Sequence, residues 1–304
     1  MLIIAHRGCS YPGYNQNTIR AFKKVMDQGA PAVEFDVQVT QDQELVIVHN
    51  LDLTEVSTGT GVVSGSTKDY IRSLWAGNPD RGQDPIPLLQ ELIDLAATYP
   101  PTNRAVLHLE LKGPGSGQVT RDLLAQVLEA GTLRPEDFFI SSFLWQELDP
   151  LRQSFPQIPF ALLAGAIDRL GFIQAHPQAE PWIPSIFAYP MELFMLPKDK
   201  TLDQLNHRFA QVGCPQEIQQ PIRTICQQSW SGEFYTQDLI EAATTRGAYS
   251  LNLWHLSVHE SLVQRAHQAG LKVFVYTVND VQEVQRLQSI GVDGFFTDFY
   301  QDFL

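Results

Sequence analysis

Residues 32–40 read AVEFDVQVT and have the composition of a buried β-strand, rich in Val and Phe. Glu34 and Asp36 nevertheless stand in its middle, two positions apart. Side chains alternate between the two faces of a strand, so both carboxylates share one face while the valines and the phenylalanine share the other. Carboxylates are rarely buried unless they are paired or bind a cation. The stretch therefore predicts a strand with one apolar face and one acidic face.

Short apolar runs alternate with amphipathic helical patterns along the 304 residues, which is typical of βα units and a parallel sheet. Eight runs are predicted strands: 2–6, 32–37, 106–111, 138–143, 159–163, 249–253, 272–277 and 294–298. Eight is the number of strands that a (β/α)8 TIM-type barrel requires. We therefore expect an α/β fold with a single domain over residues 1–304.

Two segments do not fit a simple alternation of strand and helix and are predicted insertions. Residues 38–50 extend the second strand into a hairpin, and a segment rich in Gly, Ser and Thr follows, with a short helix near 70–75. We place this insertion at about 50–87, after strand 2. The second, at 165–247 between strands 5 and 6, is too long for one βα connection and must hold further helices. Neither has the features of a separate domain.

The composition argues against several classes of protein. A net charge of −13 disfavours a nucleic-acid binder and electrostatic attachment to an anionic membrane. No run of about 18 apolar residues is present, and the start MLIIAHRG lacks the basic region of a signal peptide. The chain has three cysteines and no CxxC pair. An odd number of cysteines without such a pair favours a reducing compartment. We expect a cytoplasmic protein without stable membrane association; its oligomeric state is not predicted.

The third predicted strand repeats the acidic pattern. In AVLHLELKG, residues 105–113, the side chains of His108, Glu110 and Lys112 share one face. Glu110 adds a third carboxylate to Glu34 and Asp36, and ligands that are all oxygens favour a hard cation, Mg²⁺ or Ca²⁺, over zinc. Lys112, one step nearer the barrel mouth, can hold an anion. The alternative is a buried network of carboxylate–lysine ion pairs without a cation, and spacing alone does not separate the two.

Two histidines close apolar runs: His6 ends LIIAH and His49 ends LVIVH. Imidazole titrates near neutral pH, so a pair can serve as general acid and general base. Arg7, next to His6, offers the planar donor fork that suits phosphate. Barrel enzymes keep their active sites at the carboxyl ends of the strands, where these residues and the carboxylates are expected to meet. Together they indicate phosphoryl chemistry.

In this order, these residues resemble the glycerophosphodiester phosphodiesterase family. The similar motifs are AHRG at 5–8, NTIRAF at 17–22, GAPAVEFDVQVTQD at 29–42, VIVH at 46–49, LELK at 109–112, ISSF at 140–143, VYTVN at 275–279 and GVDGFFTD at 291–298. They extend over nearly the whole chain. The combination of HRG, ExD and a later histidine is the specific part, since each motif alone is weak.

The resemblance implies a TIM-type barrel that hydrolyses small glycerophosphodiesters to sn-glycerol 3-phosphate and an alcohol, with one divalent cation. It implies that His6 and His49 are the catalytic pair. The positions that match the family's cation ligands are Glu34, Asp36 and Glu110. The positions that match its substrate contacts are Arg7, Lys112 and Tyr276. Which histidine is the acid, and whether a glycerol hydroxyl or water attacks phosphorus, stays open.

Three positions depart from the family pattern. Gln16 stands where the family usually has glutamate, Asn50 where it usually has aspartate, and Tyr276 where it often has tryptophan. The two amides remove negative charge near the site while they keep an oxygen acceptor, so weaker metal affinity or altered catalysis is expected. Tyr276 keeps an aromatic wall for the glycerol.

Two alternative functions are open. A lysophospholipase D or a phospholipase C-like phosphodiesterase would need an apolar ridge at the barrel mouth. The candidates for such a ridge are Phe187, Tyr189, Phe194, Met195 and Leu196. A non-catalytic binding protein on the same scaffold is favoured only by the two amide substitutions, and the intact set of carboxylates and histidines argues against it.

Overall fold

The computed structural model describes residues 1–164, 178, 205–211, 213–230 and 237–304. Its strands are β1 (Leu2–His6), β2 (Ala32–Val39), β3 (Leu45–Ile47), β4 (Val106–Leu111), β5 (Phe138–Ser142), β6 (Phe160–Ala164), β7 (Ser250–Trp254), β8 (Lys272–Tyr276) and β9 (Gly294–Thr297). The main α-helices are α1 (Ile19–Asp27), α2 (Lys68–Arg72), α3 (Leu89–Ala97), α4 (Ser116–Glu129), α5 (Asp149–Ser154), α10 (Gln216–Trp230), α11 (Gln237–Arg246), α12 (Glu260–Gln268) and α13 (Val281–Ser289).

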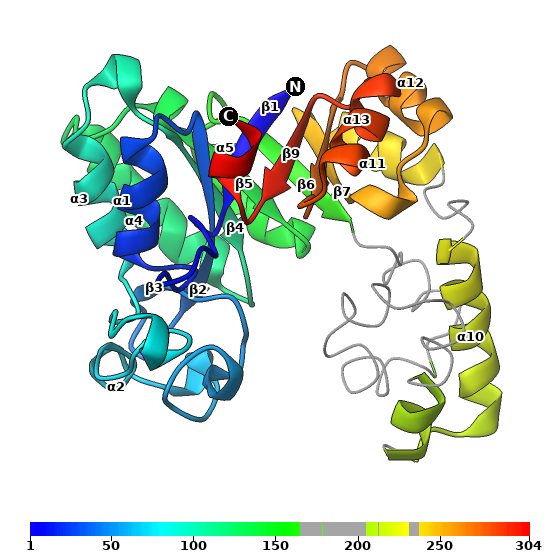
Figure 1. Cartoon of the computed structure of the whole chain (residues 1–304), viewed down its shortest axis with the longest axis horizontal. Helices are drawn as coiled ribbons and strands as arrows, with labels where there is room; N and C mark the ends of the chain where they lie inside the picture. The colour runs from blue at the N-terminus through cyan, green and yellow to red at the C-terminus, as the bar shows by residue number, and fades with distance from the viewer. Residues whose placement is uncertain (165–177, 179–204, 212, 231–236) are drawn as a thin grey trace.

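Parallel strands in the described part of the chain form a closed barrel. Their order is β1-β9-β8-β7-β6-β5-β4-β2, and the pairs β1–β9 and β1–β2 close the ring. Parallel neighbours need crossover connections, and Figure 1 shows helices around the outside of the strands. The predicted (β/α)8 barrel is confirmed. Each predicted strand matches a strand of the structure to within two residues at either end.

Alternation along β2 places its side chains as predicted. The apolar residues are fully buried between strand and helix, where the Phe35 ring centroid lies 5.8 Å from that of Phe22 on α1. Glu34 and Asp36 face the barrel axis instead. The register of β2 with β4 sets Asp36 opposite Glu110, so the acidic residues of the two strands lie side by side.

A layer of rings fills the barrel beneath the carboxylates. His108 lies opposite Glu34 in the sheet. Its ring centroid is 4.6 Å from that of Phe139 and 5.1 Å from that of Phe296. Burial lowers the pKa of His108 to about 3, so the ring is uncharged. The carboxylates thus stand above a largely apolar base, where charges interact more strongly than in water.

The strand β2 continues into the predicted hairpin, because β3 pairs with it in antiparallel fashion. The following segment has its own apolar cluster, formed by Val46, Val48, Leu53, Val63, Ile71, Leu74, Ala76 and Ile86. The helix predicted near 70–75 is α2, which begins earlier because the Thr67 side chain caps it by accepting from the Tyr70 N–H. In Figure 1 this insertion lies at the end of the barrel to which the strands point.

Two polar side chains attach this insertion to the loop and helix that follow β1. The buried amide of Asn15 donates to the carbonyl oxygens of Asn78 and Gly82, each at 3.0 Å, and accepts from the Asn78 N–H. Arg20 forms a bidentate ion pair with Asp84, with N···O distances of 2.8 and 2.6 Å. The insertion is therefore held against the amino-terminal loop at the mouth of the barrel.

The second predicted insertion, at 165–247, is described only in part. Its described residues include α10 and α11, which confirms the expected further helices. The candidate apolar ridge at 187–196 lies outside the described residues. Among the residues that the structure describes, no helix is both long and apolar enough to span a membrane.

Candidate active site

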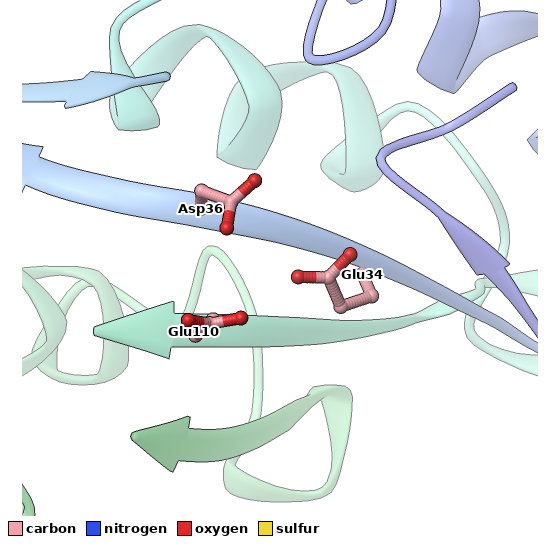
Figure 2. A group of neighbouring side chains, drawn as sticks. All are labelled: Glu34, Asp36 and Glu110. Atoms are coloured by element: carbon pink, nitrogen blue, oxygen red, sulfur yellow. The ribbon is translucent and has the colours of Figure 1, made fainter. Parts of the chain in front are cut away.

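The three predicted cation ligands lie together. Figure 2 shows Glu34 and Asp36 on β2 and Glu110 on the neighbouring β4. One oxygen atom from each carboxylate can be chosen so that all three lie within 4.8 Å of one another. The three residues are buried, with at most 9% of their surface exposed.

Each of the three carboxylates keeps a buried oxygen that accepts no hydrogen bond in the described structure. These atoms are Glu34 Oε1, Asp36 Oδ1 and Glu110 Oε1; Lys112 Nζ lies near the last two, whereas no cation lies on Glu34 Oε1 among the described contacts. A buried anionic oxygen without a partner is costly, and a hard cation ligated by oxygen atoms would satisfy it. The donor set therefore fits Mg²⁺ or Ca²⁺.

Three carboxylates face two permanently charged side chains. Arg7 Nε lies 3.1 Å from Asp36 Oδ2. Lys112 Nζ lies 2.7 Å from Glu110 Oε1 and 3.4 Å from Asp36 Oδ1. The carboxylate–lysine network that we considered as an alternative is thus also present. It leaves one negative charge uncompensated, however, and a divalent cation would compensate it.

The charge imbalance is reflected in the pKa values of the carboxyl groups. Burial, followed by the charges of Asp36 and Glu110, raises the pKa of Glu34 well above its usual range. Burial also raises the pKa of Glu110, against the opposing effect of Lys112. At Asp36 burial acts in the same direction, but the charge of Arg7, then those of neighbouring groups, outweighs it and lowers the pKa. Glu34 is therefore the group whose proton a cation would replace.

The turn after β1 positions Arg7. The φ angle of Arg7 is 51° and that of Gly8 is 80°, both in the left-handed region that residues other than glycine rarely adopt. A Cβ atom on Gly8 would lie 2.9 Å from the backbone carbon of Ala21, so only glycine fits there. The turn aims the Arg7 N–H at Glu34 Oε2, 3.1 Å away, and its guanidinium at Asp36.

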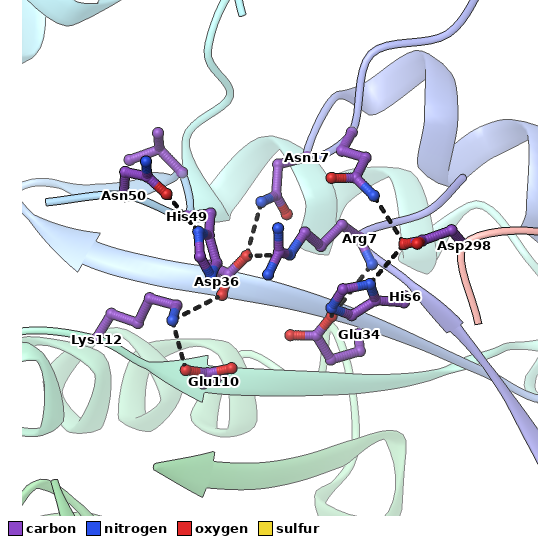
Figure 3. Close-up of polar contacts among 12 residues, drawn as sticks. His6, Arg7, Asn17, Glu34, Asp36, His49, Asn50, Glu110, Lys112 and Asp298 are labelled. Carbon is purple, nitrogen blue, oxygen red and sulfur yellow. Dashed lines mark hydrogen bonds and ion pairs between the residues drawn. The ribbon is translucent and has the colours of Figure 1, made fainter. Parts of the chain in front are cut away.

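His6 ends β1 beside Glu34 (Figure 3). Its Nε2 atom lies 3.9 Å from Glu34 Oε2, and its Nδ1 atom lies 2.7 Å from Asp298 Oδ1. Burial raises the pKa of Asp298, but the interaction with His6 and other hydrogen bonds lower it to about 2. An ionised carboxylate only accepts hydrogen bonds, so His6 Nδ1 carries the hydrogen and Nε2 faces the acidic group.

Asp298 was assigned no role from the sequence. It directly follows β9, and β9 is the neighbour of β1 in the barrel. The rule that drew attention to His6, a polar residue at the carboxyl end of a barrel strand, applies equally to Asp298 and would have identified it. Asp298 also accepts hydrogen bonds from Gln16 and Asn279, each at 2.8 Å.

His49 lies on the other side of the group, beside Asp36 (Figure 3). Its Nδ1 atom is hydrogen bonded to Asn50 Oδ1. Burial, followed by the charges of Lys112 and Arg7, lowers the pKa of His49 well below its usual range. The imidazole is therefore uncharged at neutral pH, which is the state that accepts a proton.

Of the two amides at family positions that are usually acidic, Gln16 contacts Asp298, the partner of His6, and Asn50 contacts His49 itself. Gln16 donates to Asp298, where a glutamate would be repelled, and Asn50 supplies the oxygen that His49 needs. A further amide that the sequence did not single out, Asn17, donates to Asp36 Oδ2 at 2.8 Å. The amides thus preserve the polar network around the carboxylates.

Tyr276 belongs to an aromatic edge of the site. Its ring centroid lies 5.9 Å from that of Phe143, whose own centroid lies 6.0 Å from Lys112 Nζ. The Tyr276 hydroxyl donates to the carbonyl oxygen of Ala164 at 2.8 Å. The structure therefore places Tyr276 next to the lysine end of the site, through Phe143.

A cavity of about 220 Å³ adjoins the group. Arg7, Asn17 and His49 line it on the side of the barrel. The insertion after β2 contributes Glu55, Val56, Ala76, Gly77, Asn78, Arg81 and Ile86.

Comparisons with known proteins agree with this geometry. The model of the Glycerophosphoryl diester phosphodiesterase family matches residues 6–170 and 220–302. A glycerophosphodiester phosphodiesterase from Caldanaerobacter subterraneus subsp. tengcongensis is 25% identical, over 98% of this chain and 93% of its own. One from Bacillus altitudinis is 23% identical, over 98% of this chain and 94% of its own.

Solved structures share the fold. A phosphodiesterase from Oleispira antarctica, in complex with the product sn-glycerol-3-phosphate, has a TM-score of 0.69 at 22% identity, with 99% of this chain and 94% of that chain covered. A glycerophosphodiester phosphodiesterase from Thermotoga maritima has a TM-score of 0.57 at 18% identity, with 100% and 96% covered. From the family match over most of its length, the chain belongs to the glycerophosphoryl diester phosphodiesterase family of enzymes.

Proposed function

We propose that the protein hydrolyses glycerophosphodiesters to sn-glycerol 3-phosphate and an alcohol, with the aid of one divalent cation, Mg²⁺ or Ca²⁺. The observation that carries this proposal is that His6 and His49 lie on either side of three buried carboxylates, with Arg7 and Lys112 beside them. The bound product in the Oleispira antarctica relative, sn-glycerol-3-phosphate, supports the same product here.

The ligands of the cation would be Glu34, Asp36 and Glu110. Their buried oxygens without hydrogen-bond donors support this assignment. When bound, a divalent cation supplies Lewis-acid polarisation of a phosphoryl oxygen.

Arg7 and Lys112 bind the anionic oxygens of the phosphodiester. Both are held by the carboxylates, Arg7 at 3.1 Å and Lys112 at 2.7 Å, so their positive charges are already in place when the substrate arrives. Such preorganised charge favours a transition state in which negative charge builds on phosphorus oxygens. The aromatic edge of Tyr276 and Phe143 contacts the glycerol.

His6 and His49 exchange the two protons of the reaction. One removes the proton of the attacking oxygen and the other protonates the leaving alcohol. Asp298 holds His6 in the tautomer that exposes Nε2 and stabilises the ring when it becomes charged. The uncharged state of His49 leaves it ready to accept a proton.

The alcohol of the diester occupies the cavity beside His49. The cavity has a volume of about 220 Å³. It is smaller than the pockets that bind drug-sized ligands, which measure about 300 to 1,000 Å³. A small polar alcohol such as choline, ethanolamine or glycerol fits this volume.

A coupled assay for glycerol 3-phosphate tests the proposal, with glycerophosphocholine and lysophosphatidylcholine as parallel substrates in the presence of Mg²⁺ or Ca²⁺. We expect glycerol 3-phosphate from glycerophosphocholine, with a kcat/KM at least about tenfold above that for the lysophospholipid. Faster release of lysophosphatidic acid would identify a lysophospholipase D. Binding of glycerophosphocholine without turnover of either substrate would identify a non-catalytic binding protein.

We further propose a single domain over residues 1–304 and a reducing, cytoplasmic environment. The family model matches on both sides of the second insertion, which supports one continuous barrel domain. Cys9 and Cys214 are buried free thiols, as expected where disulfides do not form.

A further inference from the structure

A chain of side chains runs from His49 into the insertion after β2. The Nδ1 atom of His49 is hydrogen bonded to Asn50 Oδ1, and Asn50 Nδ2 donates to Glu55 Oε2 at 3.1 Å. Glu55 ends a short 3-10 helix whose first residue, Leu53, is fully buried in the apolar cluster of the insertion. The backbone that carries Glu55 is therefore anchored, and its carboxylate is presented to Asn50.

The contacts at the two ends fix the orientation of the Asn50 amide. A carboxylate only accepts hydrogen bonds, so the amide NH₂ group must face Glu55 and the amide oxygen must face His49. That oxygen also only accepts, so His49 Nδ1 must carry the hydrogen. In the uncharged ring the lone pair then lies on Nε2, the nitrogen that is free of this contact.

The backbone of His49 is held by a different residue. Gln38, 2% exposed, places Nε2 at 2.8 Å from the carbonyl oxygens of Val48 and Asn50 and at 3.2 Å from that of His49. These contacts do not involve Glu55. Loss of Glu55 would therefore leave the main chain of His49 in place and would act on the orientation of the Asn50 amide.

Given the proposed function, on which this inference rests, we propose that Glu55 is a positioning residue for His49. Acting through Asn50, it selects the tautomer of His49 whose Nε2 atom exchanges protons with the substrate. An aspartate at position 50, as the family usually has, would accept from Nδ1 with either oxygen and would need no partner. The Asn50 amide has only one oxygen that can accept from His49 Nδ1, so it needs Glu55 to orient it. An aspartate at position 50 would instead be repelled by the carboxylate of Glu55.

A mutant cycle tests whether Asn50 depends on Glu55. It compares Glu55→Ala, Asn50→Asp and the double variant by their kcat and KM for glycerophosphocholine. Glu55→Ala is expected to lower kcat about five- to tenfold with little change in KM. Glu55→Gln is expected to lose less, because its side-chain oxygen still accepts from Asn50. In the Asn50→Asp background, removal of Glu55 is expected to leave kcat unchanged or to raise it. Asp69→Ala, which removes an exposed charge from α2 in the same insertion, is the control.

A second measurement reports the tautomer without any turnover. In protein labelled with ¹⁵N-histidine, the shifts of the two His49 ring nitrogens should show hydrogen on Nδ1 in the wild type and a mixture in Glu55→Ala. Unchanged shifts in Glu55→Ala, or an equal loss of kcat in both backgrounds, would overturn the proposal. If the wild type released no glycerol 3-phosphate, the proposed function would fail, while the NMR result would still decide whether Glu55 sets the tautomer.

Discussion

Replacement of His6 or His49 by alanine is expected to lower kcat for glycerophosphocholine by about 100- to 10,000-fold. In the proposed mechanism each imidazole serves a separate proton transfer, so neither compensates for the loss of the other. Both side chains are only half-buried and neither belongs to the apolar core, so the fold should survive. The measurement is steady-state kcat together with Tm and the circular dichroism spectrum of each variant.

His207→Ala is the matched control. His207 is exposed in the helical segment 205–211, which is distant in the sequence from the three carboxylates. It should retain wild-type kcat. Full activity in a correctly folded His6→Ala or His49→Ala variant would contradict the acid–base assignment.

Asp298→Asn should give a smaller loss, about 10- to 100-fold in kcat, with KM little changed. The amide oxygen still accepts from His6 Nδ1, so the tautomer is retained, but the negative charge that stabilises a protonated ring is lost. Wild-type kcat in this variant would show that His6 does not become charged during the reaction.

Asp36→Asn is the second change with a large expected effect. Asp36 is fully buried and contacts Arg7, Lys112 and Asn17, and it is one of the three ligand candidates. Loss of a residue that only supports a metal ligand costs about 10- to 100-fold in affinity or activity, so loss of a ligand should weaken Mg²⁺ binding at least about 100-fold. Turnover should fall below detection, and the free energy of unfolding should fall by about 3 kcal/mol, because two partly buried cations, Arg7 and Lys112, lose a fully buried partner.

Isothermal titration calorimetry measures the binding directly. Because the pKa of Glu34 is raised, a proton competes with the cation, so wild-type binding should release protons and tighten as the pH rises. Asp137→Asn is the control for stability. It breaks the buried Arg104–Asp137 pair, whose N···O distance is 2.7 Å, outside the ligand group. It should lower Tm without weakening Mg²⁺ binding; equal affinity in Asp36→Asn and the wild type would remove Asp36 from the ligands.

The fold and the acidic group could be predicted because both follow from local patterns. A barrel strand must present an apolar face to the helices, so the alternation in AVEFDVQVT assigns Glu34 and Asp36 to the opposite face without any knowledge of tertiary structure. The same pattern in the third predicted strand supplied Glu110, and the parallel register set it beside Asp36.

The partners of these residues depend on contacts that no local pattern contains. Asp298 reaches His6 across 292 positions of sequence, and only closure of the barrel between β1 and β9 brings them together. The orientation of Asn50 depends on Glu55 in the insertion. Spacing also could not separate a cation site from an ion-pair network, because Lys112 contacts two carboxylates and the remaining charge is evident only from the full set of contacts.

The central claim is that cation-loaded carboxylates and two histidines hydrolyse the diester, and one titration tests it most directly. Protein stripped with a chelator and passed into cation-free buffer is given glycerophosphocholine, and glycerol 3-phosphate is measured as Mg²⁺ or Ca²⁺ is added. No release is expected before addition, and after it the release should saturate with one bound ion per chain. Undiminished release by the stripped protein, or no release at any concentration of either ion, would contradict it.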